Sequence, residues 1–237
     1  MISSPDGVTP AAEHRQTRFT PLPGSTEILL VRHGESAPFR ADRPFVLVDG
    51  HGDPPLAPDG ERQAEAVGRR LADESIDAIY VTSLQRTHQT AAPLAAALGL
   101  HPRVEPDLRE IFLGEWEGGL LRQKAAEGDP LYLRMQAEQE WGVIPGAESM
   151  ALLQQRCVAS VERIHAAHPD QRIAVFVHGG VIAALCAHAT GSRPFAFNGA
   201  DNGSIHHVIV LDDQWRLRCF NDTAHLGGFT SRSQALT

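Results

Sequence analysis

Two short apolar runs, at 28–31 and 173–177, constrain the fold of this chain more than any other feature. Runs of this length and composition are typical of buried strands in a parallel sheet. The first leads into Arg-His-Gly at 32–34, and the second into His-Gly-Gly at 178–180. Open α/β sheets bind ligands at the carboxyl ends of their strands, so neighbouring strands would bring both imidazoles into one crevice.

The segments around these runs alternate between strand and helix patterns. We expect further strands at 77–81 and 101–105, a hairpin of strands at 204–211 and 215–220, and helices at 58–73, 84–98, 120–140, 148–168 and 179–190. This alternation predicts an α/β fold, a three-layer α/β/α arrangement around a mostly parallel central sheet. The late hairpin adds an antiparallel edge.

The segment 38–59 holds five prolines among glycines and charged residues. We predict a long loop there with no element of its own, of the kind that forms lids or binding edges. A single domain is expected over 25–222, between a flexible N-terminal extension at 1–24 and a C-terminal tail at 223–237.

Composition excludes several classes of protein. No apolar run approaches the roughly 18 residues of a membrane span, and the N-terminus lacks the apolar core of a signal peptide, so we expect a cytoplasmic protein. The three cysteines are widely spaced without a CxxC pair, which argues against a disulfide framework or a structural zinc site. Cys157 and Cys186 lie in apolar helical contexts and are expected to be buried free thiols.

The formal net charge of −8 comes without any basic block. Nucleic acid is therefore excluded as the main partner, since nothing would neutralise phosphates in bulk. The overall field repels anions, so an anion site has to be a local concentration of arginine and histidine.

Two further segments place suitable side chains near strand ends. Arg86 lies in the strand-to-helix junction 82–90, which repeats the arrangement of the opening run. The loop 108–118 carries Glu110, Glu115 and Glu117, and a carboxyl group from it could protonate a leaving oxygen and later deprotonate a water.

The four segments, in this order, resemble the histidine phosphatase superfamily, which is also called phosphoglycerate mutase-like. The family is named for the Arg-His-Gly motif found here at 32–34, and the resemblance runs from about 27 to 220. The run Pro-Gly-Ala-Glu-Ser at 145–149 is also similar to the family's Pro-Gly-Gly-Glu-Ser pattern.

The resemblance implies that His33 is the nucleophile and forms a phosphohistidine. It implies that Arg32, Arg86 and His178 bind the phosphoryl oxygens and that Glu110, at the family's Leu-x-Glu position, is the proton donor. Guanidinium groups suit the first task, because they donate in fixed forks to phosphate.

Two more contacts with phosphate or substrate are expected, at Ser36 and at the helix N-terminus that begins with Gly179. The other two glutamates of the loop, Glu115 and Glu117, are read as salt-bridged or simply solvated.

The sequence favours the phosphatase branch of the family. Mutases usually carry asparagine seven residues after the motif arginine, where this chain has Phe39, and the segment 111–118 is closer to phosphatases. No paired arginines for a second phosphate are evident, since Arg122, Lys124 and Arg134 lie scattered.

We therefore predict a phosphomonoester hydrolase that uses no metal or other cofactor, works at mildly acidic pH and acts on a small phosphorylated metabolite. Alternatives are mutase-type phosphoryl transfer, a metal-dependent phosphoesterase and a non-catalytic phospho-ligand binding module. Against a metal site, no His-x-His or His-Glu-x-x-His spacing occurs, and His206 and His207 would point to opposite faces of a strand.

Specificity is expected to come from the segments 38–59 and 120–141. Their apolar side chains predict a pocket that tolerates a partly apolar leaving group: Phe45, Val46, Leu47, Leu131, Tyr132, Met135 and Trp141. The alternative is that these residues pack against the sheet or form a dimer contact, so the sequence leaves a homodimer open.

Overall fold

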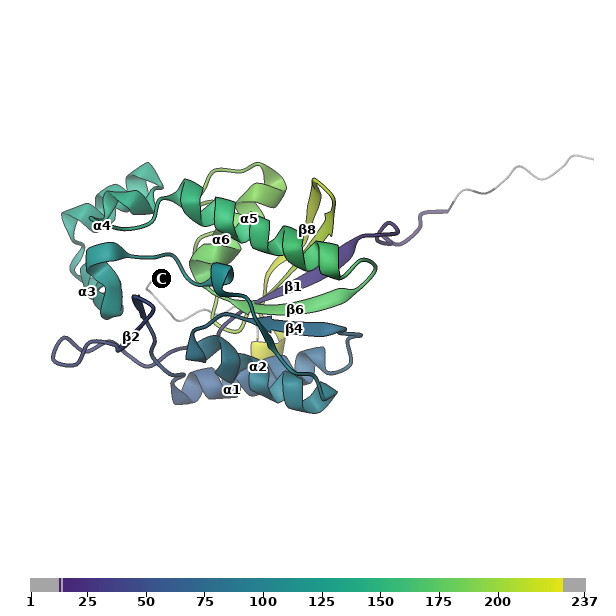
Figure 1. The fold of residues 1–237 in the computed structure, drawn as a ribbon, viewed down its shortest axis with the longest axis horizontal. Helices are drawn as coiled ribbons and strands as arrows, with labels where there is room; N and C mark the ends of the chain where they lie inside the picture. The colour runs from purple at the N-terminus through teal and green to yellow at the C-terminus, as the bar shows by residue number, and fades with distance from the viewer. Residues whose placement is uncertain (1–12, 14, 228–237) are drawn as a thin grey trace, which may run out of the picture.

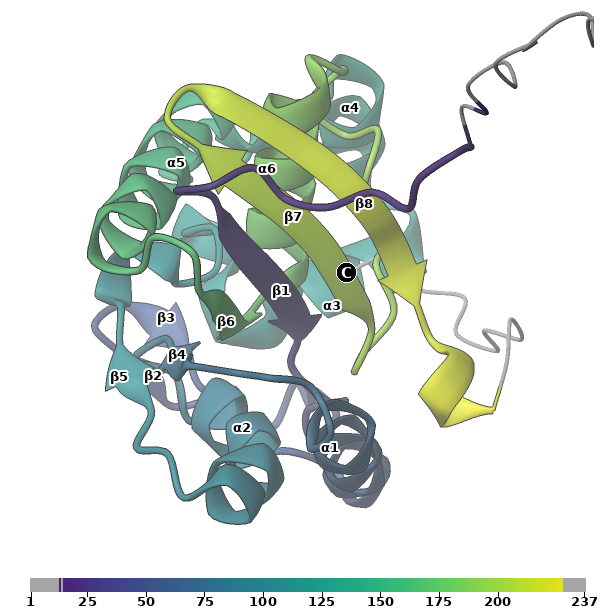
Figure 2. The same ribbon diagram turned by 90° about the vertical axis from the view of Figure 1, so that its right-hand side faces the viewer.

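A six-stranded sheet in the order β5-β4-β6-β1-β7-β8 forms the centre of the computed structural model, which describes residue 13 and residues 15–227 (Figures 1 and 2). The strands are β1 (Thr26–Arg32), β4 (Ala78–Val81), β5 (Arg103–Val104), β6 (Arg172–Val177), β7 (Ile205–Leu211) and β8 (Gln214–Asp222). The first four run parallel to one another, whereas β7 is antiparallel to both of its neighbours, β1 and β8. The predicted mostly parallel sheet with an antiparallel edge is confirmed.

Helices cover both faces of this sheet (Figure 1). One face carries α1 (Pro58–Leu71) and α2 (Gln85–Leu98), and the other carries α5 (Met150–Ala167) and α6 (Gly179–Thr190). Alternate side chains of β1 enter two separate cores, Ile28 and Leu30 on the α5–α6 side and Leu29 and Val31 on the α1–α2 side. This alternation, which follows from the period-2 geometry of a strand, produces the predicted three layers.

The two His-Gly segments meet because β1 and β6 are neighbours. Arg32 pairs with Val177 at the carboxyl end of both strands. The backbone N–H of His33 then donates to the carbonyl of Val177 at 3.0 Å. Both imidazoles therefore leave the sheet at the same edge, as the sequence predicts.

The predicted helix at 120–140 is wrong as a single element. It consists of α3 (Leu120–Glu127) and α4 (Pro130–Glu138). Gly128 ends α3 in the left-handed region at φ 63°, and the carboxylate of Asp129 caps α4 by accepting from the Leu131 N–H at 2.8 Å. Glycine after a helix and proline at its first position are standard boundary signals, which outweigh the helical pattern here.

The predicted absence of elements in 38–59 is also wrong. A small antiparallel hairpin joins β2 (Leu47–Val48) and β3 (His51–Gly52). Asp49 and Gly50 form its turn, with φ values of 49° and 84°. Asp-Gly is a common pair in such turns, because both central residues need positive φ.

Four short 3₁₀ helices complete the described elements, at Pro106–Leu108, Gly114–Gly119, Trp141–Val143 and Ala224–Leu226. Most of the predicted N-terminal extension and of the C-terminal tail lies outside the described residues.

Cys157 and Cys186 are buried and free, as expected, whereas Cys219 is exposed. No helix in the described ranges is long and apolar enough to cross a membrane.

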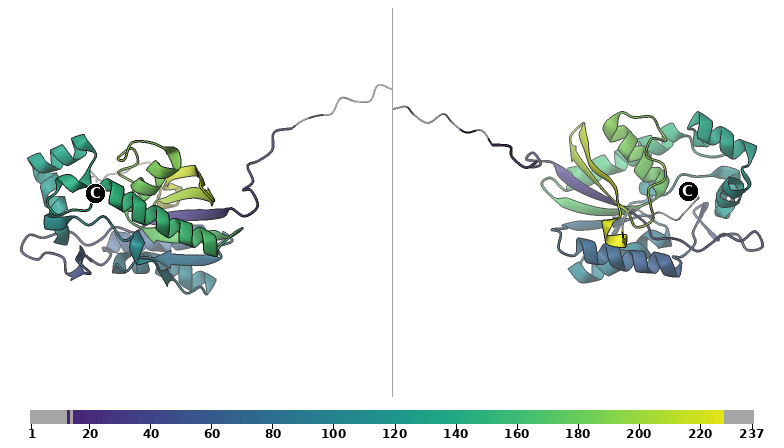
Figure 3. Two further views of the ribbon diagram at one scale, coloured as in Figure 1. Left: turned by 45° about the horizontal axis from the view of Figure 1, so that its top comes forward. Right: turned by 180° about the vertical axis from the view of Figure 1, so that it is seen from behind.

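Beyond the carboxyl edge of the sheet, α3 and α4 project from the three layers. Figure 3 shows both helices past the same end of the sheet in two further views. The chain enters them from the loop that carries Glu110 and leaves them toward α5. Together with the 38–59 segment they stand over the end of the sheet where His33 and His178 emerge.

Candidate active site

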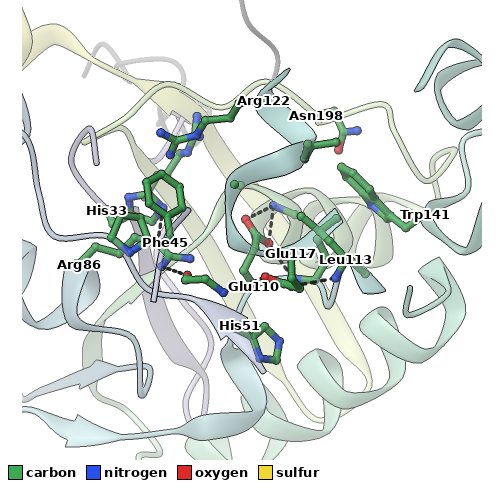
Figure 4. Close-up of a pocket in the computed structure, with 18 of the residues that line it drawn as sticks. His33, Phe45, His51, Arg86, Glu110, Leu113, Glu117, Arg122, Trp141 and Asn198 are labelled. Carbon is green, nitrogen blue, oxygen red and sulfur yellow. Dashed lines mark hydrogen bonds between the residues drawn. The ribbon is translucent and has the colours of Figure 1, made fainter. Parts of the chain in front are cut away.

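His33 lies buried at the bottom of a pocket, directly after β1 (Figure 4). Its Nδ1 is 2.7 Å from the carbonyl oxygen of Gly34 and therefore donates to it. Its Nε2 accepts from Nε of Arg86 at 3.2 Å, so the lone pair of the neutral ring is at Nε2. Burial, and then the charges of Arg86 and Arg32, hold the pKa of His33 well below its ordinary value. The ring is thus a neutral base with one available nitrogen.

Two arginines flank this imidazole. Arg86, in the first turn of α2, donates from Nη1 to the carbonyl of Gly52 at 3.0 Å and lies 3.6 Å from a carboxylate oxygen of Asp53. Burial lowers its pKa to about 10, so it stays charged at neutral pH. Arg32 ends β1 and donates to the carbonyl of Ala200. Two buried cations beside one neutral imidazole favour the binding of an anion.

His178 follows β6 and packs its ring edge-on against His33, with ring centroids 5.2 Å apart. Its Nε2 is 3.0 Å from the hydroxyl of Thr82, and its Nδ1 has no hydrogen-bond partner in the described part of the chain. Burial and the charge of Arg86 lower its pKa well below the ordinary value. Its side chain lies behind His33, whereas Gly179 and Gly180, at the N-terminus of α6, line the pocket itself.

Glu110 lies across the pocket from His33. Its carboxylate accepts from the N–H groups of Gly180 at 3.1 Å and Ile111 at 3.0 Å. A Cβ on Gly180 would lie 2.6 Å from Oε1 of Glu110, so glycine is what lets the carboxylate approach α6. Arg156 braces the same loop by donating to the Glu110 carbonyl at 3.0 Å.

The other two glutamates of the loop behave differently from each other. Glu115 is exposed, in agreement with simple solvation. Glu117 lines the pocket, and its carboxylate accepts from the N–H groups of Leu113 at 2.9 Å and Gly52 at 2.8 Å. Glu117 therefore joins its own loop to β3. The sequence predicted only a salt bridge or simple solvation for this residue.

Arg122, which the sequence suggested was merely one of several scattered charges, is a pocket residue. It donates to the carbonyl of Ala37 at 2.9 Å and to the hydroxyl of Ser36 at 2.6 Å. Ser36 is buried behind it and, within the described chain, does not line the pocket. The two residues are 86 positions apart, and no local pattern signals their contact.

The pocket has a volume of about 950 Å³, including its open mouth. Five of the seven predicted site residues line it, namely Arg32, His33, Arg86, Glu110 and Gly179. The lining also includes five apolar or aromatic side chains, which we call the apolar wall: Phe45, Ile111, Leu113, Leu121 and Trp141.

Only two of the seven apolar residues predicted to shape the pocket, Phe45 and Trp141, line it. The others are exposed or pack in the core: Val46 and Leu47 are exposed, Met135 is fully buried, and Leu131 and Tyr132 pack against the core. Met135, Leu131 and Tyr132 thus belong to the core on the α5–α6 side or pack against it, whereas a dimer contact stays a prediction.

No group of three or more histidine, cysteine, aspartate or glutamate side chains in the described ranges is arranged to hold a metal ion. His206 is buried beside Ser204, whereas His207 contacts Glu27 at 3.0 Å. Their side chains thus lie on different sides of β7.

A neutral histidine between two arginines, at the carboxyl edge of a mostly parallel sheet, is an arrangement typical of enzymes that bind and transfer phosphoryl groups. The chain belongs to the histidine phosphatase superfamily (branch 1), whose sequence model matches residues 28–223. The resemblance seen in the sequence is confirmed over almost the same range.

Relatives in this family carry both mutase and phosphatase names. The chain is 36% identical to phosphoglycerate mutase-like protein 4 of Arabidopsis thaliana over 207 residues, covering 84% of this chain and 86% of that protein. It is 31% identical to a metal-independent phosphoserine phosphatase of the same plant, covering 87% of each chain.

Solved structures agree with the fold. A mycobacterial glucosyl-3-phosphoglycerate phosphatase superposes with a TM-score of 0.70 at 25% identity, over 84% of this chain and 100% of that one. A phosphoglycerate mutase from Bacillus anthracis superposes equally well, with a TM-score of 0.70 at 21% identity over 86% and 96% of the two chains.

Proposed function

We propose that the protein hydrolyses small phosphate monoesters through a phosphohistidine formed on Nε2 of His33. One observation carries this proposal: Nδ1 of His33 donates to the Gly34 carbonyl, which leaves the lone pair at Nε2 facing the Arg86 guanidinium. A nitrogen fixed in this way is a ready nucleophile for a phosphoryl group held by the same arginine.

In the first half of the reaction, Arg32, Arg86 and the N-terminus of α6 hold the three phosphoryl oxygens. Nε2 of His33 attacks phosphorus, a P–N bond forms, and the P–O bond to the alcohol breaks. Glu110 gives its proton to the leaving oxygen. The ring of His178 packs against His33 and supports the nucleophile from behind. Positioning and charge stabilisation account for most of the catalysis in such transfers.

In the second half, water attacks phosphorus from the side that the alcohol has left. Glu110, now a carboxylate, takes a proton from that water, the P–N bond breaks, and inorganic phosphate leaves. The two guanidinium groups supply the positive charge that a metal ion supplies in other phosphatases. We therefore expect activity without added metal and in the presence of a chelator.

Mutase-type transfer is the second candidate, and one observation favours it. Arg122 adds a third cation to the pocket, where a second phosphate could bind. The apolar wall argues for hydrolysis, because it offers little to hold a phosphorylated product while the product turns around. Phosphate release measured against formation of a phosphate isomer separates the two reactions.

The test of the proposed function is trapping of the phosphoenzyme. Protein mixed with a ³²P-labelled monoester and quenched in alkali, which preserves phosphohistidine, should retain label on the wild type and on His188→Ala. The His33→Ala variant should retain none and should lose at least ~10³-fold in kcat/KM, since the attacking nitrogen is removed. His188 is an exposed histidine of α6 and serves as the matched control. Label or full activity in a folded His33→Ala variant would overturn the mechanism.

A further inference from the structure

Arg122 is held in one orientation on the pocket wall. It lies in the first turn of α3, and two of its N–H groups are used by the Ala37 carbonyl and the Ser36 hydroxyl. The ring of Phe45 packs against its guanidinium, with 5.2 Å between the carbon of that group and the ring centroid. Figure 4 shows Arg122 and Phe45 together at one side of the pocket. Its remaining N–H groups are thus pre-oriented.

The charge of Arg122 is not neutralised by a direct ion pair. Among the described residues, no carboxylate oxygen comes within 4.0 Å of its guanidinium nitrogens. Burial lowers its pKa, and the one carboxylate that opposes this effect is the exposed Glu35. A half-buried cation without a carboxylate partner is unfavourable in the empty pocket and becomes favourable when an anion binds.

The transferred phosphoryl group does not need this cation. Arg32, Arg86 and Gly179, the first residue of α6, line the pocket together with His33 and can hold that group. Of the three arginines that lower the pKa of His33, Arg122 has the smallest effect. Its neighbours in the pocket are Phe45 and Leu121, which belong to the apolar wall.

We propose that Arg122 binds a second anionic group, a carboxylate or a second phosphate, on the alcohol part of the substrate. The body of that alcohol lies against the apolar wall between Phe45 and Trp141. This inference rests on the proposed function, and it assigns the substrate to the phosphate monoesters of acidic alcohols.

The test uses binding of phosphonates, which cannot be hydrolysed, so it does not depend on turnover. Calorimetry compares benzylphosphonate with its 2-, 3- and 4-carboxy isomers and with the corresponding phosphonomethyl compounds. We expect the best carboxylated or bisphosphonate ligand to bind wild-type protein about tenfold or more tightly than benzylphosphonate, a typical gain for a charge-assisted hydrogen bond. Comparison of the carboxylated ligands with the bisphosphonates shows which second anion the site prefers.

Arg122→Met should reduce this preference to about twofold or less, while Arg134→Met should keep it. Arg134 is exposed on α4 and pairs with Glu138 at 2.7 Å, so its variant changes the net charge equally without touching the pocket. The inference is overturned if wild-type protein shows no preference for any second anion. It is also overturned if a folded Arg122→Met variant loses affinity equally for all ligands, because Arg122 would then hold the transferred group.

Hydrolysis of phenyl phosphate is measured in parallel. Absence of hydrolysis by the wild type would overturn the proposed function, while the phosphonate preference still decides the role of Arg122.

Discussion

A single imidazole carries most of the chemistry, and its surroundings keep it neutral. His33 is buried among cations, and the same arginines that bind phosphate disfavour protonation of the ring. The Gly34 carbonyl fixes the tautomer, so the lone pair stays on the nitrogen that faces the pocket. The nucleophile is thus activated by its electrostatic setting, without a dedicated base beside it.

The protonation state of His33 can be measured directly. Because burial and two arginines lower its pKa, the ring should stay neutral as the pH falls through 6.5 and should become protonated only below that value. Nitrogen NMR of ¹⁵N-histidine-labelled protein, with His33 assigned from the His33→Ala spectrum, would follow this titration. A midpoint at or above pH 6.5 would contradict the electrostatic description of the site.

Replacement of Glu110 by glutamine should separate the two halves of the reaction. With 4-nitrophenyl phosphate the leaving group needs little protonation, so phosphorylation should continue, whereas attack by water loses its base. We expect a burst of about one equivalent of nitrophenol and a kcat lower by ~10²–10⁴-fold. Glu115→Gln, an exposed change in the same loop, should show neither effect. A Glu110→Gln variant that turns over normally would remove Glu110 from the mechanism.

Among the elements, the β2–β3 hairpin has the most direct influence on the site. Arg86 donates to the Gly52 carbonyl, and the carboxylate of Asp53 accepts from the Gln85 N–H at 2.9 Å while lying beside Arg86. Burial raises the pKa of Asp53 despite these partners. The hairpin thus orients the arginine that faces the nucleophile.

Asp53→Asn should therefore weaken phosphate binding, with a smaller effect on the free energy of unfolding. We expect the inhibition constant of inorganic phosphate to rise by about threefold to tenfold, from the loss of one charged partner of Arg86. Asp49→Asn is the control from the same hairpin, because Asp49 is exposed and asparagine tolerates its positive φ of 49°. Equal inhibition constants in the Asp53→Asn variant and the wild type would show that Asp53 does not orient Arg86.

Several elements and site residues follow from local sequence signals. Apolar runs and strand-end histidines predict β1, β6 and the meeting of His33 with His178. Gly99, which ends α2 in the left-handed region, is likewise a local signal. The contact of Arg122 with Ser36 follows instead from packing of α3 over the pocket, which no local pattern encodes. Glu117 likewise finds its second backbone partner 65 residues away, at Gly52.

For the whole molecule, three buried histidines link stability to pH. Burial lowers the pKa values of His33, His178 and His206, and that of His206 falls to about 3. In the unfolded chain such groups titrate near 6.5, so below that pH the unfolded state binds more protons than the folded state. Stability should therefore be fully present above about pH 6.5 and should decrease as the pH falls.

His206→Gln tests this linkage without replacing a catalytic residue. The imidazole accepts from the Asn221 N–H at 3.1 Å and contacts the Ser204 hydroxyl at 3.0 Å, contacts that an amide can partly replace. The free energy of unfolding of the variant should depend less steeply on pH between about 6 and 4, by about 1.4 kcal/mol per pH unit. Urea unfolding at several pH values provides the measurement. Parallel slopes for variant and wild type would show that His206 is charged in the folded protein.

The two parts of the pocket come from different segments of the chain, and this difference affects how the protein can evolve. The phosphate end is built from strand ends that also hold the sheet together, so substitutions there endanger folding and chemistry at once. The opposite wall comes largely from the 38–59 segment and from the helices inserted between the Glu110 loop and α5. After gene duplication, a copy can acquire a new substrate by substitutions among these wall side chains, provided that Gly52 and Asp53 still orient Arg86.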